Sequence, residues 1–126
     1  MEKIERQIQT AIVTGPTGAV GTALCSRLLQ AGCTVVAVCR PGSPRAVALP
    51  KDANLYVVAC DAANLADLPQ CMAAAGLPMQ ADAFFHLAWA HTIGAGRNDM
   101  PAQIENIRYT IDAVRTAAAM GCRVFG

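Results

Sequence analysis

The chain has 126 residues, of which 54% are hydrophobic and 15% charged, and its ten basic and nine acidic side chains leave a formal net charge of +1. This composition suits one globular domain over residues 1–126 and excludes an intrinsically disordered chain. The near-neutral charge excludes a nucleic-acid surface, and no apolar run reaches the roughly 18–20 residues of a membrane span.

The amino-terminal segment and the cysteines indicate a cytoplasmic protein. Residues 1–7 are polar and contain acids, unlike the apolar core of a signal peptide. The six cysteines include no Cys-x-x-Cys pair and do not cluster with His86 or His91. Several stand in apolar runs, where a thiol acts as a small hydrophobe. We therefore expect reduced, structural cysteines and no metal site.

The first elements in chain order are a strand and a helix. Residues 10–14 form a short apolar, β-branched run, which predicts a buried strand. Residues 19–31 predict a helix that ends at Gly32, because apolar residues recur at helical spacing. The stripe expected to be buried consists of Val20, Leu24 and Leu28.

Two further strands are expected at 34–39 and 55–60, each almost continuously apolar, which is typical of a sheet covered on both faces. The segment 41–50 between them is rich in proline and glycine and predicts a loop with at most one short helix. Residues 65–75 then show helical spacing, and Pro69 fits such a helix only within its first turn.

The last third predicts a strand at 83–88, a polar loop at 89–99, a long helix at 101–120 and a strand that starts at 123. One face of the long helix is apolar through Ile104, Ile107, Ile111, Val114 and Ala118. Alternating strands and helices imply parallel pairing through right-handed crossovers. We therefore expect an α/β fold with a doubly wound, Rossmann-like parallel sheet of order 3-2-1-4-5, truncated in its fifth strand.

Residues 14–21 read Thr-Gly-x-x-Gly-x-x-Gly between a predicted strand and a predicted helix, the context of a phosphate-binding turn. In that interpretation Gly15 permits the turn, Gly18 lets a pyrophosphate approach, and Gly21 lets the helix pack closely. The helix dipole and the exposed backbone N–H groups favour the anion. The remaining residues expected around the pyrophosphate are Thr17, Ala19 and Val20.

The end of the second strand indicates which dinucleotide would bind. An acid there would hold the ribose hydroxyls of NAD, but Cys39 is followed by Arg40, with Arg45 nearby. A guanidinium can pair with a 2′-phosphate, which favours NADP, with NAD still possible. The alternative is that Arg40 is a solvated surface cation. Because the strand order reverses between the first and fourth strands, residues 15–21 and 87–91 should face one crevice.

Four stretches together resemble the amino-terminal part of the extended short-chain dehydrogenase/reductases, the group of NAD(P)-dependent epimerases and dehydratases: Thr14–Gly21, Cys60-Asp61, Phe84–Trp89 and Asn106–Thr110. The resemblance implies that Asp61 bonds the adenine amino group, with Ala62 beside it. It also implies that Asn106 braces the fourth strand. The residues that would line the cofactor at the end of that strand are Leu87, Ala88 and Trp89.

By the same resemblance, the chain is the NAD(P)-binding half of an oxidoreductase, epimerase or dehydratase that acts on a nucleotide-linked sugar. The family's catalytic Ser or Thr and its Tyr-x-x-x-Lys pair are expected beyond Gly126, because Tyr56 and Tyr109 have no lysine four residues on. We therefore expect no catalytic residue here. The alternative is a non-enzymatic NADP(H)-binding or redox-sensing module. An open sheet edge at residues 124–125 also predicts self-association.

Overall fold

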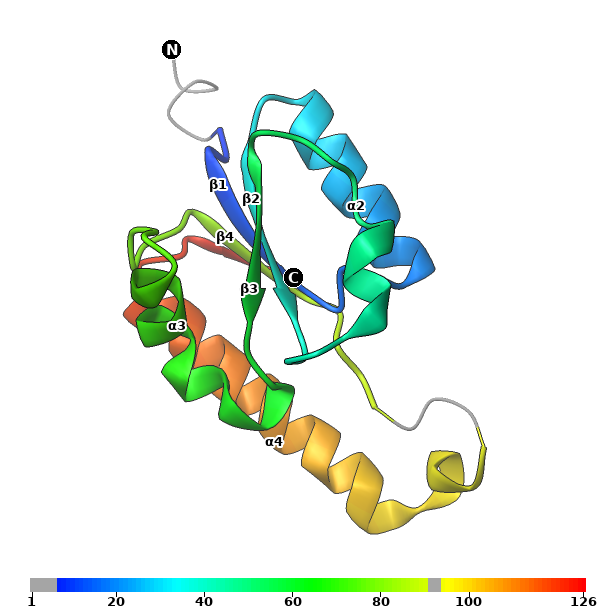
Figure 1. Ribbon diagram of the computed structural model, residues 1–126. Helices are drawn as coiled ribbons and strands as arrows, with labels where there is room; N and C mark the ends of the chain where they lie inside the picture. The colour runs from blue at the N-terminus through cyan, green and yellow to red at the C-terminus, as the bar shows by residue number, and fades with distance from the viewer. Residues whose placement is uncertain (1–6, 91–93) are drawn as a thin grey trace.

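The computed structural model describes residues 7–90 and 94–126, in which strands and helices alternate (Figure 1). The strands are β1 (Thr10–Thr14), β2 (Thr34–Cys39), β3 (Leu55–Ala59), β4 (Ala83–His86) and β5 (Val124–Phe125). The α-helices are α2 (Ala19–Gln30), α3 (Leu68–Ala74) and α4 (Met100–Ala119). The 3-10 helices are η1 (Pro44–Ala48), η2 (Ala62–Asp67) and η3 (Ala95–Asn98).

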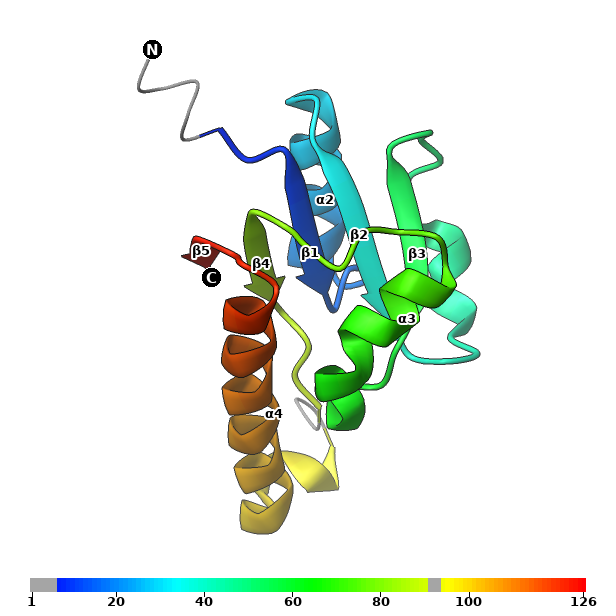
Figure 2. The same ribbon diagram turned by 90° about the vertical axis from the view of Figure 1, so that its left-hand side faces the viewer.

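The strands form one parallel sheet in the order β3-β2-β1-β4-β5, which confirms the predicted fold class and strand order. Helix α2 covers one face of the sheet, and α3 and α4 cover the other (Figure 2). The larger core cluster lies under α3 and α4 and is centred on side chains such as Ile12 and Phe84. A second cluster, which includes Val13 and Cys25, lies under α2.

The expectation that the sheet is covered on both faces is wrong for β3. This strand pairs only with β2 and forms an edge of the sheet. Tyr56 and Val57 are 42% and 49% exposed, while Val58 is buried. The apolar run and the predicted strand order therefore give the strand and its edge position correctly, but they do not show that Tyr56 and Val57 stay exposed.

The helix predicted at 65–75 is divided into two elements. Asn64 has non-helical backbone angles inside η2, and the α-helix proper begins at Leu68. Pro69 consequently lies in the first turn of α3, as expected of a residue without a backbone N–H. The cap of η2 is Asp61, whose Oδ1 accepts a hydrogen bond from the Ala63 N–H at 2.9 Å.

One predicted apolar stripe points to solvent, and another does so only at its first residue. In α2, Val20 is 69% exposed, while Leu24 and Leu28 of the predicted stripe pack against the core beside Cys25. In α4 the apolar face is exposed at Ile104, Ile107, Ile111 and Val114. The buried face of α4 consists of Asn106, Ala113, Thr116 and Ala117. These mostly small side chains let the helix lie close to its neighbours, and the Thr116 hydroxyl donates to the Leu65 carbonyl at 3.1 Å.

Within residues 7–90 and 94–126, no helix combines the length and apolarity needed to cross a bilayer.

Candidate dinucleotide site

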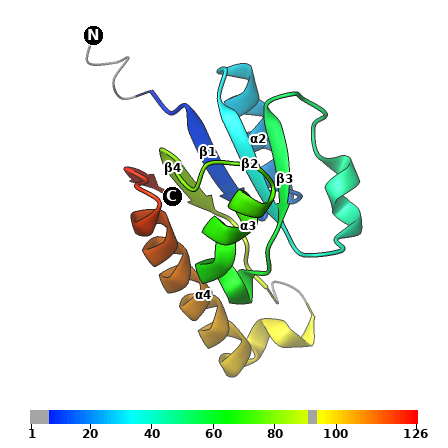
Figure 3. The same ribbon diagram turned by 60° about the vertical axis from the view of Figure 1, so that its left-hand side comes forward.

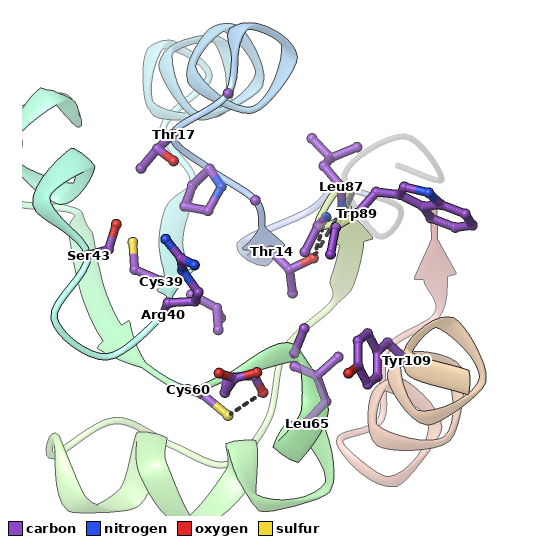
Figure 4. Close-up of a pocket in the computed structure, with 18 of the residues that line it drawn as sticks. Thr14, Thr17, Cys39, Arg40, Ser43, Cys60, Leu65, Leu87, Trp89 and Tyr109 are labelled. Carbon is purple, nitrogen blue, oxygen red and sulfur yellow. Dashed lines mark hydrogen bonds between the residues drawn. The ribbon is translucent and has the colours of Figure 1, made fainter. Parts of the chain in front are cut away.

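A cavity of about 870 Å³ opens at the carboxyl ends of the strands, where the order reverses between β1 and β4. Figure 4 shows Arg40, Cys39 and Ser43 on one side of this cavity, and Leu87, Trp89 and Tyr109 on the other, with Thr14 between them. The predicted site residues that line it are Gly15, Thr17, Gly18, Arg40, Asp61, Ala62, Leu87, Ala88 and Trp89. Ala19, Val20 and Gly21 do not line it.

The three glycines of the turn serve different purposes. Gly15 has φ +64°, and a Cβ there would stand 2.7 Å from the Leu87 carbonyl carbon. A Cβ on Gly21 would collide with the Gly15 carbonyl oxygen and the Pro16 backbone, so Gly21 packs the helix onto the turn. A Cβ on Gly18 would meet nothing closer than 3.9 Å. The protein therefore needs glycine at 15 and 21 for its own packing, whereas the space over Gly18 is available to a ligand.

The amino terminus of α2 completes an anion site beside Gly18. Gly18 is the N-cap residue, no side chain caps the helix, and its first turn contains no acid. The helix dipole therefore faces the cavity without a protein carboxylate to offset it. Ala19 and Val20 can contribute only backbone N–H groups, because the Val20 side chain points to solvent. A glycine cradle of this kind fits a dinucleotide pyrophosphate.

Thr14 joins the ends of β1 and β4 through its hydroxyl. Thr14 Oγ1 accepts hydrogen bonds from the Leu87 N–H at 3.1 Å and the Ala88 N–H at 3.2 Å. Because both lone pairs are then used, we assign the hydroxyl proton to the 2.8 Å bond with His86 Nδ1. The strand predicted at 83–88 ends at His86. The next two residues, Leu87 and Ala88, are held by their hydrogen bonds to Thr14.

His86, the last residue of β4, is half-buried and does not line the cavity. Burial lowers the pKa of His86, so the neutral imidazole predominates at pH 7. With Nδ1 accepting from Thr14, the proton resides on Nε2, which has no hydrogen-bond partner among the described residues. The Thr14 hydroxyl, which positions residues 87 and 88, can donate to His86 only while the imidazole is neutral and Nδ1 carries no proton.

At the β2–β3 end, the cavity contains one carboxylate and two guanidinium groups. Arg40 and Arg45 are exposed and line it together with Ser43. Asp61 is half-buried and also caps η2, so it occupies the start of a helix as well as the cavity wall. Burial raises the pKa of the Cys60 thiol to about 12, so this cavity cysteine is protonated at neutral pH and is a poor nucleophile.

At the β4 end, α4 contributes two amides. Asn106 is 1% exposed; its Oδ1 accepts from the Ala90 N–H at 2.9 Å, and its Nδ2 donates to the Ala90 carbonyl at 2.8 Å. Gln103, one turn earlier on the same face, accepts from the Trp89 indole N–H at 3.0 Å. Sequence reasoning missed Gln103, although its spacing of three from Asn106 was a signal that both face the same segment.

Of the expected crevice between residues 15–21 and 87–91, residues 15–18 and 87–90 line one cavity, whereas residues 19–21 do not. His91, named in that expectation, lies outside the described residues. Across residues 7–90 and 94–126, no three His, Cys, Asp or Glu side chains lie together as a metal-binding group would. The cavity thus has Arg40 on one side and Trp89 on the other, with the end of β1 between them.

The comparisons with known proteins agree with this geometry. The sequence model of the NAD dependent epimerase/dehydratase family matches residues 11–125. The solved enzyme WbmH of Bordetella bronchiseptica, in complex with NAD+, is 22% identical with a TM-score of 0.72, covering 94% of this chain and 38% of its own. The epimerase Mth375 of Methanothermobacter thermautotrophicus is 23% identical with a TM-score of 0.73, covering 96% and 35%.

A third solved structure, MoeE5 in complex with UDP-glucuronic acid and NAD, is 24% identical with a TM-score of 0.69 and covers 92% of this chain and 35% of its own. At these identities the likeness shows the fold. Among curated proteins, acetoacetyl-CoA reductase of Allochromatium vinosum is 53% identical over 36 residues, which are 29% of this chain and 15% of that protein. The chain thus spans little more than a third of the length of the solved relatives it resembles.

Proposed function

The chain belongs to the NAD dependent epimerase/dehydratase family, and from this membership and the geometry of the cavity we infer that it is the NAD(P)-binding part of an oxidoreductase, epimerase or dehydratase. The observation that carries the proposal is the cradle at Gly18. It combines open space over a glycine with an uncapped, acid-free helix terminus. Both features serve an anionic ligand, and neither is required by the fold.

The residues around the cavity fit a dinucleotide laid across the sheet. Gly18 and the start of α2 would hold the pyrophosphate, Asp61 and Ala62 the adenine, and Leu87 to Trp89 the nicotinamide end. The bound cofactor supplies hydride transfer. The protein groups described above contribute binding and orientation, with the Thr14 hydroxyl holding the backbone at the nicotinamide end.

We propose NADP as the preferred dinucleotide, with NAD as the alternative. Arg40 is exposed at the cavity wall directly after β2, where a 2′-phosphate on the adenosine ribose would be placed. Arg45 and Ser43 line the same end and would add a second charge and a hydroxyl donor. Family membership supports a nicotinamide dinucleotide without deciding between the two forms.

For the whole protein, we propose a nucleotide-linked sugar as substrate, which the complex of MoeE5 with UDP-glucuronic acid supports by analogy. This chain alone is proposed to bind cofactor without turnover, because neither of its tyrosines is followed by a lysine four residues on. The proton donor that such chemistry requires contributes about 10²–10⁴-fold to the rate. The alternative, a non-enzymatic NADP(H) sensor, predicts cofactor binding without turnover even in a longer protein that includes this chain.

The first test is the substitution Gly18→Val. Because a Cβ at Gly18 meets only ordinary contacts and φ is −73°, the variant should fold normally. Its branched side chain would occupy the pyrophosphate space, so we expect calorimetric titration to show NADPH affinity at least tenfold weaker. The control is Ala23→Val, an exposed position in the same helix, which should bind like the parent. Equal affinity of the Gly18 variant would contradict the proposed site.

The second test concerns the choice of dinucleotide. Arg40→Asp replaces a cation with an anion at the expected 2′-phosphate, so we expect the ratio of NADPH to NADH affinity to fall at least tenfold. The control is Arg27→Asp, which makes the same charge change at an exposed position in α2. If the ratio changes equally in both variants, Arg40 acts only through net charge and the NADP assignment is wrong.

A further inference from the structure

The amide of Gln103 has a single orientation, which its neighbour Asn106 imposes. Asn106 is buried, and its Oδ1 and one Nδ2 hydrogen are used by the backbone of Ala90. The other Nδ2 hydrogen is directed at Gln103 Oε1, at 3.2 Å. Gln103 must therefore present its oxygen to Asn106. If the oxygen and nitrogen of the Gln103 amide were exchanged, the Gln103 NH2 group would face the Asn106 NH2 group and no hydrogen bond could form.

With its oxygen fixed in this way, Gln103 binds the indole and the loop backbone together. Gln103 Oε1 accepts from Trp89 Nε1 at 3.0 Å, and Gln103 Nε2 donates to the carbonyls of Gly96 and Arg97 at 3.2 and 3.3 Å. One side chain on α4 thus connects Trp89, in the segment after β4, to the middle of η3. The position of the Trp89 ring depends on this connection, since Nε1 is the only polar atom of the indole.

Trp89 bounds the β4 end of the cavity. Figure 4 shows it beyond Leu87 as seen from Arg40, at the end opposite the expected adenine site. The side chain is 48% exposed and lies next to the half-buried, apolar residues Leu87 and Ala88. An indole released from its hydrogen bond would gain apolar contact by folding onto those residues, which would fill the cavity end.

We propose that Gln103 is a positioning residue that keeps this end of the cavity open for the nicotinamide half of the cofactor by holding the Trp89 indole aside. The inference rests on the proposed dinucleotide function. It assigns Gln103 an effect on one half of the ligand only, because Gly18, Arg40 and Asp61 follow the ends of β1, β2 and β3, and the hydrogen bonds described above join none of them to Gln103.

The experiment compares two ligands that differ only in the nicotinamide half, NADH and ADP-ribose, on the full chain. Gln103→Met keeps the side-chain length but removes the hydrogen bonds to Trp89, Gly96, Arg97 and Asn106. We expect NADH affinity about three- to tenfold weaker, the range of one net hydrogen bond, and unchanged ADP-ribose affinity. The control, Gln80→Met, makes the same change at an exposed position outside the cavity and should alter neither affinity.

Fluorescence reports the indole directly, because Trp89 is the only tryptophan. In Gln103→Met its emission should move to shorter wavelengths as the ring becomes buried. The decisive comparison is made in a Trp89→Ala background, where no indole can fill the cavity. There, Gln103→Met should no longer weaken NADH binding.

Three results would overturn the inference: unchanged NADH affinity in Gln103→Met, an equal loss for ADP-ribose, or a loss that persists without Trp89. Retained ADP-ribose binding also shows that the variant is folded. Failure of the proposed function gives a different result, since the parent chain itself would then bind neither NADH nor ADP-ribose.

Discussion

The hydroxyl of Thr14 determines where the chain runs after β4. It accepts two backbone N–H groups from residues beyond the strand and is itself oriented by His86. Thr14 is 2% exposed, so without the oxygen the Ala88 N–H would have to find a partner in a nearly dry environment, whereas the Leu87 N–H also donates to the Thr14 carbonyl at 3.1 Å. A threonine that looks like an ordinary strand residue therefore aligns residues 87 and 88 with the glycine turn.

Replacing Thr14 with valine, which has the same shape, should destabilise the protein. The Ala88 N–H and the imidazole would lose their partner, at about 1–3 kcal/mol for each group left unpaired, while the Leu87 N–H would keep its bond to the Thr14 carbonyl. We expect Thr14→Val to lower the free energy of unfolding by at least about 2 kcal/mol in urea denaturation. Thr14→Ser retains the oxygen and should cost less than half as much. Equal losses in both variants would mean that the methyl group, and not the oxygen, stabilises the site.

Acidification should destabilise the protein through His86. Because burial lowers the pKa of His86 below that of the unfolded chain, the unfolded state binds the proton first as the pH falls. The contribution of His86 to the free energy of unfolding is therefore fully present above the pKa of about 6.5 that histidine has in the unfolded chain. It declines as the pH falls towards the pKa of His86 in the folded protein. Protonated Nδ1 could also no longer accept from Thr14.

The free energy of unfolding measured from pH 7.5 to 5 should show this decline, and His86→Gln should reduce it. An NMR titration that places His86 above 6.5 would contradict the prediction.

Helix α4 carries its apolar residues on the side away from the core. Met100, Ile104, Ile107, Ile111 and Val114 are 46–70% exposed and follow the alternating four- and three-residue spacing of a helix-pairing seam. Beside this seam, charges alternate in sign at Glu105, Arg108, Asp112 and Arg115. Figure 3 shows α4 along the border of its layer, next to α3. In an antiparallel pair of α4 helices centred near residues 109 and 110, opposite charges would face each other and Ile107 would face Ile111.

This pattern gives the expected self-association a location in addition to the sheet edge at Phe125. Ile107→Glu should raise the dissociation constant of a dimer at least tenfold, because each copy loses a buried side chain worth about 1.5–3 kcal/mol. Glu105→Arg and Arg115→Glu should each weaken association, and together restore it. Sedimentation at several concentrations measures the association of the parent chain, the three single variants and the double variant. A parent chain that stays monomeric at high concentration would refute the pairing.

At the scale of the whole molecule, the cavity is assembled from segments that only the sheet brings together. Its walls come from the turn after β1, the ends of β2 and β3, the residues after β4 and one face of α4. A ligand that contacts all of them binds the folded state alone and stabilises it by mass action. At a concentration of 100 times its Kd, NADPH should add about 2.7 kcal/mol and raise the melting temperature by roughly 10 °C. Gly18→Val should abolish most of this shift while melting normally without ligand.

Local patterns in the sequence were sufficient for the fold class, the strand order and the glycine turn. Strands, helices and the turn at residues 14–21 depend on short-range properties, namely apolar periodicity, helix-ending glycines and proline positions, which neighbouring residues determine. Parallel pairing then follows from alternation and handedness. The likeness of four stretches to a known family also indicated that Asp61 and residues 87–89 lie at the cavity, and they do line it.

The tertiary structure alone decided which faces are buried and which polar groups meet. The apolar side of α4 and the residues Val20, Tyr56 and Val57 are exposed because burial depends on what packs against an element, which periodicity does not contain. The hydrogen bonds that Thr14 accepts from Leu87, and Gln103 accepts from Trp89, join residues that are distant in sequence or on separate elements. Hydrogen-bond partners are set by distances of a few ångströms in space, and those distances exist only once the sheet and the helices have packed together.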